Sequence, residues 1–287
     1  MKTPKGLLPL IDDGIIESVL RQLQSGKEAA VYVVSTGSRI CCAKVYKQAQ
    51  QRSFKRAVEY TEGRKARGSR NARAVGKRSS YGREVVEAEW KNAEVEALYR
   101  LVKVGVRVPQ PYGVFDGVLL MELVNDADGQ PAPRLSEVEM TSEQALEWHD
   151  FMISQIVLML CDGLIHGDLS EFNVLIGPDG PVIIDLPQAV NAAGNNNAFR
   201  MLSRDINNMR TTFGRVAPQI LETEYALEIW TLFEGGRLKP ESKLTGEFVR
   251  DETSVDVDDV LTHIEEARRE AEARQLGREE AARLDVD

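Results

Sequence analysis

Three oxygen-bearing side chains in the second half of the chain are spaced as if to meet in one site. Asp168 and Asn173 lie five residues apart in the segment His-Gly-Asp-Leu-Ser-Glu-Phe-Asn at 166–173, and Asp185 follows twelve residues later. The carboxylate of Asp168 can orient an attacking hydroxyl group and accept its proton. Asn173 and Asp185 offer the oxygen ligands that Mg²⁺ prefers, and they leave coordination positions for phosphate and water. This spacing predicts a site for phosphoryl transfer from ATP, with Asp168 as the catalytic base.

A lysine in the first half supplies a matching positive charge. Lys44 lies in the middle of an apolar β-type run, where an ammonium group needs a counter-charge or a phosphate. In a site of this kind the lysine holds the α- and β-phosphates of ATP while it pairs with a glutamate on a helix. Glu94 is the predicted partner, because apolar residues of the helix expected at 84–103 share its face. Glu87 or Glu89 is the alternative.

Two further segments are candidates for contacts with the nucleotide. The pentapeptide Ser-Gly-Lys-Glu-Ala at 25–29 stands where a phosphate-binding loop is expected, although it has a single glycine. Ser25 and Lys27 could donate hydrogen bonds to phosphates. The apolar run at 119–124 fits a hinge between two lobes, whose backbone would bind adenine.

The first half of the chain is predicted to be rich in strands. Asp12 or Asp13 can cap a helix over 14–24, whose isoleucine, valine and leucine residues share one face. Two pairs of β-type runs joined by turn residues predict two hairpins, and the helix over 84–103 lies between them. The predicted strands are 30–35, 39–46, 111–115 and 118–123, with turns at 36–38 and 116–117.

The second half is predicted to be mainly helical. Thr141 and Gln144 form a capping box that begins a helix through Cys161, and Gly163 is placed to end it. The other predicted elements are strands at 174–176 and 182–184, a helix capped by Ser203 and a helix over 216–235.

The order of strands first and helices second predicts an α+β fold of two lobes with a cleft between them. The small N-lobe is rich in strands, and the mainly helical C-lobe carries a short hairpin. The predicted divisions are an N-terminal helical segment 1–24, an N-lobe 25–124 with a basic flexible insertion 48–83, a linker 125–135, a C-lobe 136–240 and an acidic helical tail 241–287.

Charge is distributed unevenly along the chain. Residues 52–83 hold eleven Lys and Arg against two Glu, a net charge of +9 in a chain whose total is −9. Such a segment can bind RNA or another acidic partner, although it has few aromatic residues on which bases could stack. The tail 241–287 carries a net charge of −8.

Composition and cysteine usage favour a cytoplasmic protein that does not contact a membrane. The chain is 43% hydrophobic and 28% charged, and its three cysteines suggest neither a disulfide framework nor a metal site. No apolar run reaches the roughly 20 residues needed to span a bilayer. Residues 1–10 lack the apolar core of a signal peptide.

The chain resembles the RIO family of atypical protein kinases over residues 10–235. The motifs that carry the resemblance are SGKEA at 25–29, AKVYK at 43–47, VPQP at 108–111, LLMEL at 119–123, HGDLSEFNVL at 166–175 and IDLPQAV at 184–190. The resemblance implies a protein-kinase-like two-lobed fold, the RIO domain. It also implies serine/threonine protein kinase activity, autophosphorylation included, with ATP and with Mg²⁺ or Mn²⁺ as cofactors.

Carried over by position, the resemblance gives each motif residue a role. The implied roles are catalytic base for Asp168, metal ligands for Asn173 and Asp185, ion pair for Lys44 and Glu94, phosphate contacts for Ser25 and Lys27, adenine-binding hinge for Glu122 and Val124, and support of the catalytic loop for Asp205. Some relatives act chiefly as ATPases, with phosphate passing transiently to the metal-binding aspartate. Here that residue would be Asp185.

Two other functions stay open at this point. Small-molecule kinases of the aminoglycoside and choline type also carry the pattern HGDLxxxN, although the SGKEA loop and the pair Pro187-Gln188 favour the RIO-like interpretation. An ATP-gated RNA or ribosome assembly factor, with residues 52–83 binding RNA, is the third interpretation.

Overall fold

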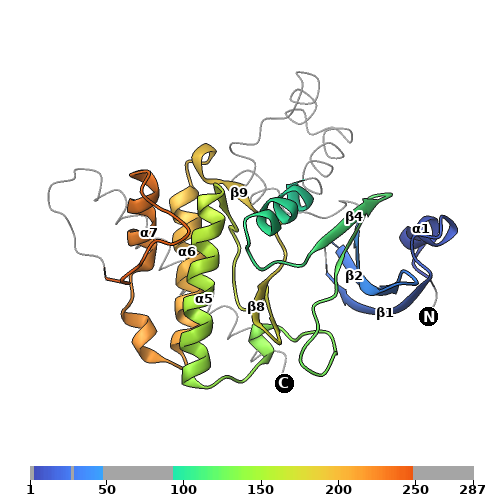
Figure 1. Cartoon of the computed structure of the whole chain (residues 1–287), viewed down its shortest axis with the longest axis horizontal. Coiled ribbons are helices and arrows are strands. Elements are labelled where there is room, and N and C mark those ends of the chain that lie inside the picture. The colour runs from blue at the N-terminus through green and yellow to red at the C-terminus, as the bar shows by residue number, and fades with distance from the viewer. Residues whose placement is uncertain (1–2, 27–28, 48–92, 248–287) are drawn as a thin grey trace, which may run out of the picture. The chain divides into compact units, whose positions relative to one another are not determined.

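The computed structural model describes residues 3–26, 29–47 and 93–247 (Figure 1). The chain divides into two compact units, which we call unit 1 and unit 2. Unit 1 comprises Met1–Pro133 and Leu175–Ala189, and unit 2 comprises Arg134–Val174 and Val190–Asp287. The predicted basic insertion, the first part of the helix predicted at 84–103 and the acidic tail from residue 248 lie outside the described residues.

Unit 1 is built on a five-stranded sheet with the strand order β1-β2-β3-β5-β4, in which every pairing is antiparallel. Strands that follow one another in the sequence pair as hairpins, except that β3 pairs with β5 rather than with β4. The strands are β1 (Ser18–Ser25), β2 (Ala29–Ser35), β3 (Ile40–Tyr46), β4 (Pro111–Phe115) and β5 (Val118–Glu122).

Both predicted hairpins are confirmed. Asp116 and Gly117 have φ angles of 46° and 76°, as a two-residue turn of type I′ requires at both central positions. Gly37, in the turn between β2 and β3, has a φ angle of 79°. The turn between β2 and β3 sets the register of that hairpin, so Val31 lies opposite Lys44. The pairing of β3 with β5 places the same lysine opposite Leu119.

One face of the sheet packs on the N-terminal segment and forms the core of unit 1. The alternate residues Ala30, Tyr32 and Val34 of β2 contribute to it, together with Leu7 and Leu10. The two short helical elements of this segment are η1 (Lys5–Leu7) and α1 (Leu8–Asp12).

The predicted helix over 14–24 is wrong, because β1 occupies Ser18–Ser25. The helical segment α1 ends at Asp12, and Gly14 has a φ angle of 69°, which turns the chain into the strand. The apolar residues do not share one buried face. Leu20 and Leu23 are exposed, and the antiparallel pairing of β1 with β2 decides the structure instead.

A helix over 93–103 corresponds to the end of the helix predicted at 84–103. Ala97, Leu98 and Leu101 are buried, as their helical spacing predicted. Glu94 is also buried, so this helix holds one carboxylate on its apolar face.

A short hairpin of β7 (Val174–Gly177) and β8 (Gly180–Ile183) confirms the two strands predicted there. The predicted C-lobe included this hairpin, but residues 175–189 group with unit 1. Backbone hydrogen bonds explain the grouping, since Ile176 N donates to Pro133 O and Ile183 N donates to Arg107 O, both at 2.9 Å.

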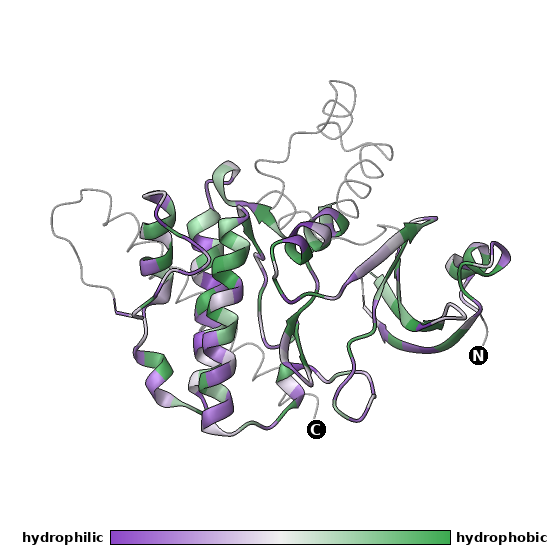
Figure 2. Ribbon diagram, viewed as in Figure 1, coloured by the Kyte–Doolittle hydropathy of each residue, from purple (hydrophilic) through white to green (hydrophobic). Residues whose placement is uncertain are grey.

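Three helices, α5 (Ser142–Cys161), α6 (Ala198–Gly214) and α7 (Tyr225–Glu234), pack against one another in unit 2 (Figure 1). The predicted capping box begins α5: Gln144 N donates to Thr141 Oγ1, and Thr141 N donates to Gln144 Oε1. Both α5 and α6 carry hydrophobic and hydrophilic residues side by side along their length (Figure 2). The remaining elements of this unit are η2 (Leu135–Glu137), β6 (Leu164–Ile165), β9 (Val190–Asn191), η3 (Ala192–Gly194) and η4 (Pro218–Glu222).

Two predictions for unit 2 are wrong in their boundaries. Ser203 does not cap α6 but is buried inside it, because the helix already begins at Ala198 after a turn in which Asn197 N donates to Asn195 Oδ1. The helix predicted over 216–235 is interrupted: the 3-10 turn η4 comes first, and α7 follows. Among the described residues, none of the helices combines the length and the apolar character needed to cross a membrane.

Candidate active site

Lys44 of β3 binds two carboxylates within unit 1. Its Nζ donates to Oε1 of Glu94 at 2.5 Å and to Oδ1 of Asp185 at 2.9 Å. The predicted ion pair between Lys44 and Glu94 is therefore confirmed. The alternatives Glu87 and Glu89 lie outside the described residues.

Burial and charge together fix the protonation state of this lysine. Lys44 and Glu94 are buried, whereas half of the Asp185 side chain is exposed. Burial on its own lowers the pKa of Lys44, but the carboxylates of Glu94 and Asp185 outweigh it and raise the pKa above its ordinary value. The group therefore keeps its positive charge, as a contact to phosphate requires.

Tyr46 is a member of this network that the sequence analysis did not identify. Its hydroxyl group donates to Oε2 of Glu94 at 2.7 Å, so the two oxygens of that carboxylate bind different strand residues. The signal was present in the sequence, because residues two apart on a strand share a face and Tyr46 follows Lys44 by two. The tyrosine fixes the orientation of Glu94 and, through it, of the lysine.

The backbone at Asp185 has an unusual conformation. Its φ angle is 66°, which places a residue with a side chain in the left-handed region. Such a conformation is disfavoured for L-residues by about 1–2 kcal/mol and is common at functional sites. Here it occurs two residues after the end of β8, in the residue that binds Lys44.

The loop predicted to bind phosphate is held by a second lysine. Lys47, just beyond the end of β3, donates from Nζ to Ser25 Oγ at 2.8 Å and to Gly26 O at 2.7 Å. Ser25 is exposed at the end of β1, and Lys27 lies outside the described residues. The sequence analysis assigned no role to Lys47.

The predicted hinge has its own ion pair. Arg107 binds both carboxylate oxygens of Glu122 at 2.7 and 2.9 Å, and Gln110 N donates to the same carboxylate. Burial alone would raise the pKa of Glu122, but these hydrogen bonds and the guanidinium charge lower it. The carbonyl oxygen of Val124 accepts from Ala132 N at 2.9 Å. Binding of adenine by the backbone of Glu122 and Val124 stays a prediction.

The loop that contains Asp168 is held from both sides within unit 2. Asn173 Nδ2 donates to the carbonyl oxygen of Asp168 at 2.9 Å, which closes the loop on itself. From α6, Asp205 accepts hydrogen bonds from Gly167 N at 2.7 Å and from Leu169 N at 3.0 Å. The carboxylate of Asp205 thus binds the amide groups on either side of Asp168, which supports the bracing role predicted for it.

The carbonyl groups on either side of Asp168 are also bound from α6. Arg204 donates to Gly167 O, and Asn208 Nδ2 donates to Leu169 O at 2.7 Å. Asn208 is a second residue that the sequence analysis missed. Burial raises the pKa of Asp205 to about 6, although the charges of His166 and Arg204 and the bound amides oppose the rise. Three residues of one helix therefore fix the peptide groups that orient the proposed base.

Each of the two predicted metal ligands offers an oxygen of the type that a hard divalent cation prefers. Because the amide nitrogen of Asn173 is bound to Asp168 O, its Oδ1 is the atom that faces away from that bond and can coordinate a metal ion. Asp185 offers a half-exposed carboxylate. No three His, Cys, Asp or Glu residues cluster as a metal site in the described part of the chain.

The predicted site residues thus form two groups. Unit 1 brings Lys44, Glu94 and Asp185 together, and unit 2 brings Asp168 and Asn173 together. The meeting of the two groups at one nucleotide stays a prediction.

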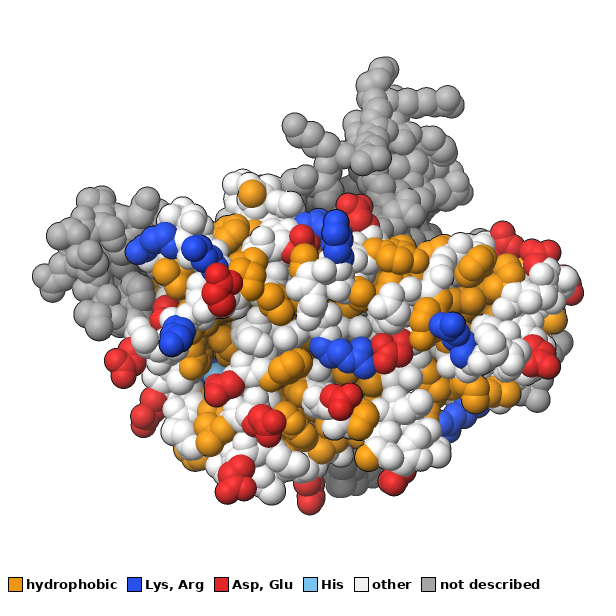
Figure 3. Space-filling view, in the orientation of Figure 1, with side chains coloured by type: hydrophobic (Ala, Val, Ile, Leu, Met, Phe, Trp, Pro, Cys, Tyr) orange, Lys and Arg blue, Asp and Glu red, His pale blue; other side chains and the backbone are white. Residues whose placement is uncertain are grey.

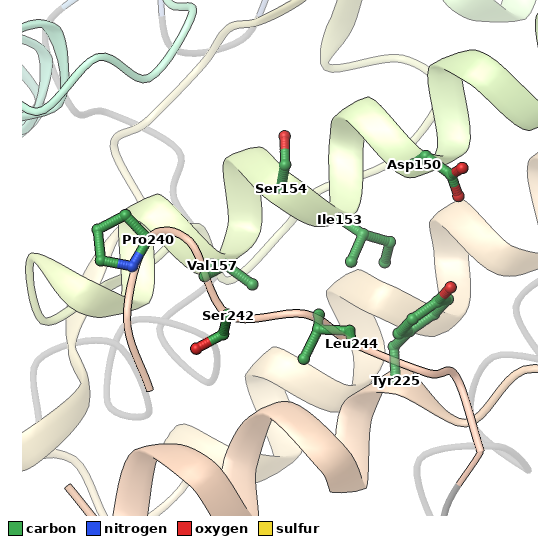
Figure 4. Close-up of a pocket in the computed structure, with 8 residues that line it drawn as sticks. All are labelled: Asp150, Ile153, Ser154, Val157, Tyr225, Pro240, Ser242 and Leu244. Atoms are coloured by element: carbon green, nitrogen blue, oxygen red, sulfur yellow. The ribbon is translucent and has the colours of Figure 1, made fainter. Parts of the chain in front are cut away.

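A groove of about 230 Å³ in unit 2 contains none of the predicted site residues. In Figure 4, Ile153 of α5, Tyr225 of α7 and Leu244 turn towards one another. Asp150 also lines the groove, and Figure 3 shows acidic side chains scattered over the face that it presents. The hydroxyl group of Ser154 in the lining donates to Phe151 O of the same helix at 2.6 Å.

Comparison with known proteins identifies the family. Residues 30–226 match the model of the RIO domain. The chain is 34% identical over 206 residues to the RIO-type serine/threonine-protein kinase Rio1 of Haloferax volcanii, a match that covers 72% of this chain and 67% of the relative. It is 34% identical over 223 residues to the serine/threonine-protein kinase RIO3 of Caenorhabditis elegans and 30% identical over 227 residues to human RIO1. These two matches cover 76% and 78% of this chain but only 41% and 38% of the relatives.

Unit 1 is rich in strands and holds Lys44 in an ion pair with Glu94, and unit 2 is helical and holds the loop of Asp168 through Asp205. These features are those of a protein-kinase-like fold. The chain belongs to the RIO family of serine/threonine kinases.

Proposed function

We propose that this chain transfers the γ-phosphoryl group of ATP to serine or threonine hydroxyl groups of a protein, itself included. The observation that carries the proposal is the loop around Asp168. All four backbone groups of its two neighbouring residues, Gly167 and Leu169, are bound by side chains of α6. So complete a restraint on the two neighbours of one half-buried carboxylate is expected where that carboxylate must be held in position for catalysis.

Each residue has a defined part in the proposed reaction. Asp168 orients the attacking hydroxyl group and accepts its proton as the bond to phosphorus forms. Lys44, whose charge and direction are set by Glu94, contacts the α- and β-phosphates. The backbone of Glu122 and Val124 binds adenine, and Ser25 with Lys27 contacts the phosphates.

The proposed metal ligands are Asn173 and Asp185. A bound Mg²⁺ or Mn²⁺ ion would neutralise charge on the phosphates and orient them. The chain's own contribution is to orient each ligand within its own unit, Asn173 through its bond to Asp168 O and Asp185 through its bond from Lys44.

Substitution of the site residues tests the proposal. We expect Asp168→Ala to keep nucleotide affinity and to lower kcat by about 10²–10⁴-fold, because only the group that orients the hydroxyl is lost. Lys44→Ala and Asp185→Ala should lose nucleotide affinity as well as turnover. The matched control is Asp150→Ala, which removes an exposed carboxylate from the same unit as Asp168. Unchanged turnover in Asp168→Ala would overturn the assignment of the base.

The stability of the phosphorylated product distinguishes a kinase from an ATPase. After incubation with γ-labelled ATP and Mg²⁺, label that survives acid indicates phosphoserine or phosphothreonine. Label released by neutral hydroxylamine indicates an acyl phosphate, formed when an oxygen of Asp185 attacks the γ-phosphorus and ADP leaves. The physiological protein substrate, a partner for residues 52–83 and the cytoplasmic location stay predictions.

A further inference from the structure

Lys47 is a charged residue of unit 1 to which the proposed reaction assigns no role. It follows the last residue of β3 and is exposed. Its ammonium group reaches the turn after β1, where it donates to Ser25 Oγ at 2.8 Å and to Gly26 O at 2.7 Å. Gly26 N in turn donates to Ala29 O at 2.9 Å, so this end of the turn is closed by both a side-chain and a backbone bond.

The two lysines of this region differ in how their charge is balanced. Lys44 is bound by Glu94 and by Asp185, and the three groups together carry one negative charge. Lys47 is bound by a hydroxyl group and a carbonyl group, both neutral, and within the described residues no carboxylate lies at ion-pair distance from it. Of these two lysines, Lys47 is therefore the one whose positive charge remains for a new anion.

The contacts of Lys47 also suit exchange for phosphate oxygens. A lysine has three N–H donors, and two of them are engaged here by acceptors weaker than a phosphate. Because Ser25 Oγ accepts from Lys47, its own hydroxyl hydrogen can point elsewhere and donate to an anion. A turn that presents a hydroxyl group beside an ammonium group is a typical setting for phosphate recognition.

We propose that Lys47 is a phosphate-binding residue of the nucleotide site and that it holds the turn at Ser25 and Gly26 in place until the phosphates arrive. This inference rests on the proposed function, since it assigns a further residue to the same nucleotide. It also predicts that the contribution of Lys47 depends on the number of phosphates in the ligand, which a purely structural role would not produce.

Nucleotide affinities measured on the full chain test this role. Dissociation constants for adenosine, AMP, ADP and ATP are compared for wild type and for Lys47→Met, which keeps the length of the side chain and removes its charge. EDTA is present, so that no metal ion replaces that charge. We expect ADP and ATP to bind about tenfold to a hundredfold more weakly to Lys47→Met, as the loss of a charge-assisted hydrogen bond implies. Adenosine should bind as to wild type.

Two further variants make the test specific. Lys47→Arg restores the charge and should recover most of the affinity for ATP. Lys103→Met removes another exposed lysine of unit 1, at the end of the helix over 93–103, and should leave all four affinities unchanged. The inference would be overturned if Lys47→Met bound adenosine and ATP more weakly by the same factor, or bound both as tightly as wild type does. In either case, binding of ATP by the wild-type chain would leave the proposed function intact. A wild-type chain that binds none of the four ligands would remove the proposed function and the inference together.

Discussion

The hydrogen bond from Tyr46 to Glu94 allows a sharp test of how the lysine pair is held. Glu94 is 2% exposed, and its two oxygens bind Lys44 and Tyr46 at 2.5 and 2.7 Å. Tyr46→Phe removes the hydroxyl group without changing the ring. Glu94→Gln removes the negative charge while it keeps the size of the side chain. The double variant completes a cycle that isolates the interaction between the two residues from any other bond that each one makes.

The size of the expected coupling follows from the kinds of bond involved. A hydrogen bond to a charged group contributes about 1.5–3 kcal/mol, and one between neutral groups contributes about 0.5–1.5 kcal/mol. Glu94→Gln converts the first kind into the second. The coupling free energy between the two positions should therefore be about 1–2 kcal/mol, with each single substitution destabilising unit 1.

Native-state hydrogen exchange of the β3 amides measures this coupling, because it reports the stability of the strand that carries Lys44 and Tyr46. Tyr32→Phe is the matched control. Tyr32 is a buried tyrosine of β2 that belongs to the core cluster on the other face of the sheet, and no partner for its hydroxyl group is found among the described residues. Its coupling with Glu94→Gln should be below about 0.5 kcal/mol. A value equally small for Tyr46 would refute the claim that the tyrosine positions Glu94.

Two predictions concern unit 2. Burial raises the pKa of Asp205 from 3.8 to about 6. Protonation of this carboxyl group therefore stabilises the folded protein as the pH falls through 6. The same protonation removes the anionic acceptor that binds the amide groups of the catalytic loop. The turnover rate of the wild-type protein should therefore decrease as the pH is lowered below about 6. A pH–rate profile of Asp205→Asn should lack this decrease. An identical decrease in the variant would assign it to another group. Thr141→Ala should lower the free energy of unfolding by about 0.5–2 kcal/mol through loss of the capping box. Urea unfolding should show no such loss for Ser142→Ala, and equal losses would contradict the capping role.

Local sequence signals predicted the elements that depend on few residues. The turn Asp116-Gly117 needs positive φ angles at adjacent positions, and few residue pairs other than Asn-Gly and Asp-Gly supply them easily. The capping box needs only Thr141 and Gln144, three residues apart. The burial of Glu94 followed from its place among Ala97, Leu98 and Leu101 on one face.

Elements whose structure depends on distant partners were harder to predict. The spacing of apolar residues over 14–24 fits a helix, yet β1 forms because β2 offers it backbone partners along most of its length. Ser203 fits a helix cap by residue type, but the turn at Asn195 begins α6 earlier. In both cases a tertiary or neighbouring contact outweighs a weak local preference.

The same distinction separates the reacting groups of the site from the residues that hold them. Asp168 and Asn173 could be found because both belong to one short loop, in which the second binds the first. Arg204, Asp205 and Asn208 lie more than thirty residues away, and only the helical repeat of α6 brings them to one face. Of these three, Asp205 was predicted through the family resemblance and not from local spacing. A helix face that is otherwise apolar can carry polar residues at positions i, i+1 and i+4. Such residues need buried hydrogen-bond partners, and the backbone groups of a tight loop can serve as those partners. A helix with that pattern after an aspartate loop is therefore evidence for the loop's rigidity, and it can be sought in the sequence as deliberately as the catalytic motif itself.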